Sequence, residues 1–181
     1  MKYIFLAMII FPVLSFSKNN CQSDGYSCIK TSAGEIQFIS RTDSGDEYSY
    51  IYFNGDLIYK DKTDYFIPEP IGFENDNLDT EIIKFVVSYY SFNNCKKGVD
   101  DYNCNVNILL DLSSKKPIIS NKFSPPSEGS HISWASVGKK NSIIAFDDDS
   151  RFKYENGKVE MIYGGYVEEQ KKIEMEKKKN K

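Results

Sequence analysis

The side chain best suited to acid–base catalysis is His131, the only histidine among the 181 residues. It stands in the sequence Gly-Ser-His-Ile-Ser-Trp, directly after Ser130. A serine hydrolase of the α/β type presents its nucleophile on a sharp turn within a Gly-X-Ser-X-Gly motif, which this chain does not contain. Because Ser130 is adjacent in sequence, its hydroxyl cannot easily reach the imidazole ring. We therefore expect His131 to anchor a loop or to lie on the surface.

Acidic side chains provide the second candidate chemistry, either cation binding or glycoside cleavage. The densest acidic run is 147–149, but the twelfth position from its start is Lys158, where a calcium loop needs a bidentate Glu. The run is more typical of a turn that joins two strands, and we predict no metal site. Paired carboxylates for glycoside cleavage leave no local pattern, so that chemistry stays open. The acidic candidates for partner binding are Asp147, Asp148, Asp149, Glu74 and Asp76.

Four cysteines could form disulfides or hold a zinc ion. The chain has no Cys-X-X-Cys pair and only one histidine, which argues against zinc. Short intervals favour the local pairs Cys21–Cys28 and Cys95–Cys104, although four cysteines allow two other connectivities. On the chain-entropy account, the second pair would contribute roughly 2–3 kcal/mol. We predict these two local disulfides.

No cofactor motif is present, because the chain contains neither a glycine-rich phosphate loop nor a dinucleotide fingerprint. Basic residues interleaved with aromatic ones, as nucleic-acid interfaces require, are also missing. One aromatic pattern does stand out, the stripe formed by Tyr48, Tyr50 and Tyr52. Tyrosine anchors many protein interfaces, but it also packs across strands within sheets. Both interpretations of this stripe remain, and packing is the simpler one.

The first seventeen residues have the pattern of a secretory signal peptide. Lys2 is followed by an apolar run that is too short to span a bilayer, and small side chains at Ser15 and Ser17 precede Lys18. We predict cleavage before Lys18 and export to a bacterial periplasm or beyond. Such compartments favour disulfides, which agrees with the prediction for the cysteines.

Period-two alternation of apolar and polar residues dominates the rest of the chain and indicates strands. Four apolar side chains of 105–112 fall on one face, opposite polar ones, and 81–90 is apolar on both faces. The second pattern is typical of a central strand that is covered on both sides. Asn54-Gly55 and Asn156-Gly157 each separate two alternating runs, which is the strongest short-range signal for a β-hairpin.

The resulting fold class is all-β, an antiparallel meander that forms a β-sandwich, an open barrel or a partial propeller-like sheet. We expect a single domain over 18–163, after the signal peptide at 1–17. The segment 164–181 is charged and poor in apolar residues, so we predict a short helix or a disordered tail there.

The charge of the chain restricts its partners. The net charge is −3 overall, yet Lys2 precedes the expected domain and four Glu and six Lys follow Gly164, so residues 18–163 carry −6. An acidic surface disfavours nucleic acid and anionic membranes and suits a basic protein. We therefore predict a non-enzymatic binding protein, an inhibitor or immunity-type protein that occludes a toxin or hydrolase. The alternatives are an envelope assembly factor, or a small hydrolase that uses His131 or paired carboxylates.

Overall fold

The computed structural model describes residues 28–70, 84–93, 96–97, 102–127, 129–137 and 141–179. Antiparallel strands dominate this part of the chain and form three four-stranded sheets, a two-stranded hairpin and a C-terminal helix. The predicted all-β fold class is confirmed. The predicted signal peptide lies outside the described residues.

The first sheet is a meander of four consecutive strands. Its strands are β1 (Cys28–Thr31), β2 (Gly34–Ile39), β3 (Ser49–Phe53) and β4 (Asp56–Asp61). The short helix α1 (Arg41–Ser44) connects β2 to β3. Asn54 and Gly55 join β3 to β4 with φ angles of 51° and 87°, the positive values that this tight hairpin needs. The hairpin predicted at Asn54-Gly55 is therefore confirmed.

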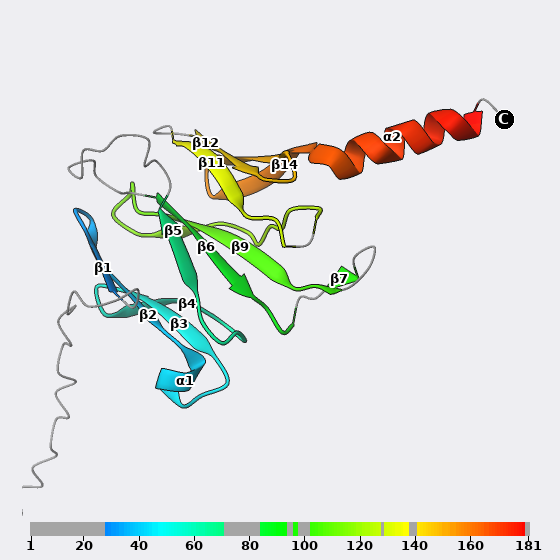
Figure 1. Cartoon of the computed structure of the whole chain (residues 1–181). Helices are drawn as coiled ribbons and strands as arrows, with labels where there is room; N and C mark the ends of the chain where they lie inside the picture. Colours follow the sequence, from blue (N-terminus) through cyan, green and yellow to red (C-terminus); the bar gives the residue numbers. More distant parts are fainter. Residues whose placement is uncertain are drawn as a thin grey trace, which may run out of the picture.

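The second sheet lies between the other two (Figure 1). Its strands, in chain order, are β5 (Ile67–Pro70), β6 (Lys84–Tyr90), β9 (Asn105–Asp111) and β10 (Ile118–Ile119), and they pair in the order β10-β9-β6-β5. The hairpin of β7 (Lys96–Lys97) and β8 (Tyr102–Asn103) is inserted between β6 and β9. We call this second sheet the central sheet.

The third sheet is again a meander, followed by the helix. It contains β11 (Ile132–Val137), β12 (Asn141–Phe146), β13 (Ser150–Glu155) and β14 (Lys158–Gly164). Asn156 and Gly157 connect β13 to β14 with φ angles of 50° and 82°, so the second predicted hairpin is also confirmed. Helix α2 (Gly165–Lys179) extends away from the sheets (Figure 1). Within the described residues no helix has both the length and the apolar character that a membrane span needs.

Both faces of the central sheet are covered, as the pattern of 81–90 predicts. Phe85 and Val87 of β6 pack in an apolar cluster with side chains of the first sheet. Val86 points to the opposite face and packs in a second cluster with the third sheet. All three are fully buried, and burying one such side chain stabilises the fold by about 1.5–3 kcal/mol. The fold thus consists of three antiparallel four-stranded sheets, with the central sheet packed between the other two.

A buried polar cluster lies between the central and third sheets. The Nζ atom of Lys84, which is 0% exposed, lies 4.0 Å from Oδ2 of Asp111 and 5.4 Å from the ring centre of Tyr154. The Tyr154 hydroxyl donates a hydrogen bond of 2.7 Å to the same Oδ2 atom. Buried charges are tolerated only when they are paired in this way. We call Lys84, Asp111 and Tyr154 the lysine cluster.

Candidate functional site

The candidate site is a groove that opens where the third sheet stops covering the central sheet. Cross-strand pairs of β6 and β9 follow one another along this face, in the order Lys84–Asp111, Val86–Leu109, Ser88–Asn107 and Tyr90–Asn105. The first two pairs contribute buried side chains. The last two pairs line a cavity of about 480 Å³. The same face therefore changes along its length from buried core to groove floor.

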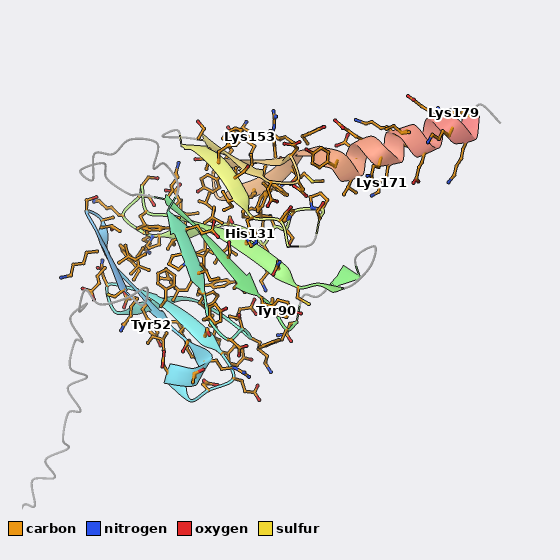
Figure 2. The ribbon with its side chains drawn as sticks, viewed as in Figure 1. Tyr52, Tyr90, His131, Lys153, Lys171 and Lys179 are labelled. Atoms are coloured by element: carbon orange, nitrogen blue, oxygen red, sulfur yellow. The ribbon has the colours of Figure 1, made fainter. Side chains whose placement is uncertain are left out.

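The opposite wall of the groove comes from the third sheet and the loop before it. Ser130, His131 and Ile132 line this wall, together with Phe146 at the end of β12. Figure 2 shows His131 beside the start of β11 and Tyr90 at the far end of β6. Edge strand β5 closes one side with Ile67 and Glu69. The groove is thus built from segments that lie far apart in the sequence.

A chain of polar side chains crosses the groove floor. The Ser88 hydroxyl lies 2.7 Å from Oδ1 of Asn107 and 3.3 Å from Oε1 of Glu69. The Asn107 amide in turn donates to the carbonyl of Phe123 at 3.4 Å. A serine hydroxyl carries one proton, and Ser88 is the donor in both contacts, so Asn107 and Glu69 share this proton. Glu69 is then left with the weaker, longer contact.

Burial raises the pKa of the Glu69 carboxyl above its usual value. The contact with Ser88 and the nearby charge of protonated His131 act in the opposite direction but do not cancel this effect. A half-buried carboxyl with a perturbed pKa inside a groove is a common mark of a functional site. Glu69 was not among the residues that the sequence singled out. The one local signal is its position between two prolines on a strand edge.

Large apolar side chains surround the mouth of the groove, and we call them the apolar rim. They are 44–58% exposed and consist of Tyr65, Ile67, Tyr90 and Phe92. The rings of Tyr90 and Phe92 meet edge to face with centroids 6.1 Å apart. The Arg41 guanidinium lies 5.5 Å from the centre of the Phe92 ring and pairs with Asp64 at 2.5 Å. Exposed apolar side chains that gather at one place mark interaction sites.

His131 is exposed, and its backbone is fixed by the acidic turn. Its N–H donates to Oδ1 of Asp147 at 3.2 Å, and its carbonyl accepts from the Asp147 N–H at 3.0 Å. Among the described residues, no hydrogen bond links the imidazole to a serine or a carboxylate. The expectation that His131 lies on the surface is confirmed. It nevertheless shares the groove with Glu69, which the sequence did not indicate.

The run 147–149 is the strand-joining turn that the sequence predicts, between β12 and β13. Asp148 is buried, and its carboxylate accepts the N–H groups of Ser127 at 3.0 Å and Ser150 at 2.9 Å. Burial alone would raise the pKa of Asp148, but these hydrogen bonds outweigh it and lower the pKa. Of the three aspartates, only Asp147 and Asp149 are exposed to solvent.

Some of the other site residues predicted from the sequence lie outside the described residues. Glu74 and Asp76 lie there, as do Cys21 and Cys95. Neither Cys28 nor Cys104 carries a free thiol, and the pairing of each with a local partner stays a prediction. Among the described residues, no three His, Cys, Asp or Glu side chains come together as a metal site.

The tyrosine stripe lies on the outer face of the first sheet, opposite the buried Ile51 and Phe53. Tyr48, Tyr50 and Tyr52 are half-buried, and successive ring centroids are 6.4 and 6.2 Å apart. The Nζ atom of Lys60 lies 4.7 Å from the Tyr48 ring centre. These contacts within the sheet agree with the packing interpretation, and the stripe is not part of the groove.

Comparison with known proteins identifies no relative. No protein-family model matches the chain, and no curated protein or solved structure is significantly similar to it.

Proposed function

We propose that this is an exported binding protein that occludes another protein, as an inhibitor or immunity-type protein does, through the apolar rim. The observation that carries this proposal is the gathering of four large exposed apolar side chains around one groove. Aromatic anchors of this kind dominate the energy of protein interfaces, and a single one can contribute more than 2 kcal/mol. The acidic charge of 18–163 suits a basic partner and would speed its association.

The alternative of an envelope assembly factor would require a partner strand to pair with an exposed sheet edge. The β5 edge of the central sheet does not favour such pairing. Pro68 and Pro70 occupy two of the four positions of β5 and offer no N–H group to an added strand. Prolines on an edge strand are a common protection against such pairing. The groove beside β5 therefore favours binding through side chains.

The proposal is tested by removing the apolar rim without disturbing the core. Wild-type protein and the variant Tyr90→Ala with Phe92→Ala would be immobilised and exposed to envelope and culture proteins of the source cell. The matched control is Met161→Ala with Ile162→Ala, since these β14 side chains are equally exposed, at 54% and 55%, but lie outside the groove. We expect to capture a partner protein that binds the wild type and the control at least tenfold more tightly than it binds the rim variant. The activity of this partner should be lost when it is bound.

Equal capture by the rim variant and the control would contradict the proposal. So would capture of a partner whose activity is unaffected at saturation, because occlusion requires that the bound partner be inactive. Association rates measured across a salt series would show in addition whether the acidic surface steers the partner.

The hydrolase alternative gains one specific observation, the shared groove of Glu69 and His131. A carboxyl with a raised pKa can donate a proton, and an imidazole nearby can accept one. The test is an assay of glycoside and ester substrates with wild type, Glu69→Gln and His131→Ala. A hydrolytic activity that both variants lose, while they still fold, would favour this alternative over the binding protein.

A further inference from the structure

We propose that the groove accepts an arginine side chain of the partner protein, with its guanidinium bound by the Glu69 carboxylate. This inference rests on the proposed function and specifies the chemistry of the bound surface. It commits to one occupant, an arginine that projects from a basic protein.

The first argument is the unused hydrogen-bonding capacity of Glu69. A carboxylate accepts about four hydrogen bonds, and within the described chain only the 3.3 Å contact from Ser88 reaches this one. The same Ser88 hydroxyl also donates to Asn107, at the shorter distance of 2.7 Å. A half-buried carboxylate with free acceptor positions is stabilised by a cation that brings several N–H donors.

The second argument is that the protein already holds one of its own arginines in this way at the same groove. The Arg41 guanidinium pairs with the Asp64 carboxylate at 2.5 Å and lies 5.5 Å from the Phe92 ring centre. Asp64 and Phe92 both line the groove. The remaining carboxyl of the groove is Glu69, and the remaining rim aromatics, Tyr65 and Tyr90, line the same groove. A planar guanidinium stacks on aromatic rings better than an ammonium does, and it binds carboxylates with two parallel hydrogen bonds.

The charged groups that face Glu69 set the pH dependence. The groove contains His131 on the opposite wall and Asp64, already paired with Arg41, at the mouth. The other polar groups on the floor, Ser88 and Asn107, are neutral. As the pH falls, Glu69 becomes protonated, and this change weakens the binding of a cation. Affinity for arginine should therefore decrease toward acidic pH.

The experiment uses small arginine probes on the full exported chain, followed by amide chemical shifts in NMR. The probes are N-acetyl-arginine methylamide, its neutral isostere N-acetyl-citrulline methylamide, and N-acetyl-lysine methylamide. We expect the arginine probe to shift amides of β5, β6 and residues 130–132, and to bind about tenfold more tightly than either other probe. Glu69→Gln should lower its affinity about tenfold, as loss of a charge-assisted pair predicts, whereas Glu174→Gln on α2 should not.

Several outcomes would overturn the inference. These are equal binding of arginine and citrulline probes by the wild type, shifts that lie away from the groove, equal binding of lysine, or unchanged affinity of Glu69→Gln. The comparison of probes needs no variant, so it decides the matter even if Glu69→Gln does not fold. If the partner is captured and Glu69→Gln binds it normally while the Tyr90/Phe92 variant does not, the arginine inference fails and the proposed function stands. If neither variant affects capture, both fail.

Discussion

The two faces of the central sheet carry different kinds of side chain, although the same two strands supply both. The face toward the first sheet, which we call the uniform face, is apolar along its whole length. It runs from Phe85 to Tyr89 on β6 and from Leu110 to Val106 on β9. On the face toward the third sheet, which we call the graded face, the character of the side chains changes at every cross-strand pair. The ion pair Lys84–Asp111 is followed by an apolar pair, then by a polar pair and the rim.

This difference separates fully buried from partly accessible surface within one sheet. Because successive side chains of a strand point to opposite faces, the two faces of one sheet can differ in composition. The uniform face contributes to stability because every position along it is buried, and only Tyr89 and Val106 at its end also line the groove. The graded face combines a buried contact at one end with an accessible groove at the other. Side chains at the groove end need not support the core, so they can serve binding.

The largest loss of stability is expected for Phe85→Ala on the uniform face. Phe85 is 0% exposed, and truncating such a ring costs about 3–5 kcal/mol through lost burial and the cavity that remains. Urea unfolding followed by circular dichroism measures this cost. Phe92→Ala at the rim is the matched control and should change the free energy of unfolding by no more than about 0.5 kcal/mol. Similar costs for the two variants would contradict the assignment of the faces.

The lysine cluster tests the buried end of the graded face. Asp111→Asn removes the charge that compensates Lys84 and should destabilise the protein by about 3 kcal/mol. Tyr154→Phe removes only the hydrogen bond to Asp111 and should cost about 1–2 kcal/mol. Lys84→Met with Asp111→Leu removes both charges and should restore much of the lost stability, because buried ion pairs seldom exceed apolar packing. A double variant as unstable as Asp111→Asn would show that the cluster contributes through something other than charge pairing.

The uniform face could be predicted from the sequence, whereas the groove could not. Turns such as Asn54-Gly55 depend on local backbone chemistry, and the alternation in 105–112 fixes which side chains share a face. The groove depends instead on how far the third sheet extends over the central one. Glu69 and His131 are 62 positions apart in the sequence, and nothing local to either residue indicates that they share a groove. The burial of Lys84 depends on the same packing of sheets.

A smaller effect should follow from Tyr89→Phe, which removes a hydroxyl from the uniform face. The Tyr89 and Tyr59 hydroxyls lie 2.7 Å apart and link the central sheet to the first sheet. Loss of this hydrogen bond should lower the free energy of unfolding by about 1 kcal/mol. Tyr52→Phe on the outer face of the first sheet serves as the control and should have almost no effect. If Tyr89→Phe were neutral, the link between these sheets would be purely apolar.

The smallest effect, and the one with opposite sign, is expected for Glu69→Gln. Burial raises the folded-state pKa of Glu69 above its unfolded value, so the folded protein favours the protonated form. At pH values below the unfolded pKa both states are protonated and Glu69 does not affect stability. As the pH rises through the folded pKa, the carboxylate ionises in a half-buried site, and this cost lowers stability. Glu69→Gln removes the charge, and we expect a gain on the order of 0.5 kcal/mol at neutral pH and none at acidic pH. Thermal unfolding of both proteins at pH 3.5 and pH 7.5 measures the difference.

A residue that weakens the fold while binding a partner's cation is what a functional groove predicts, because stability is given up where binding needs it. A loss of stability at neutral pH would instead assign Glu69 to the structure of the sheet edge.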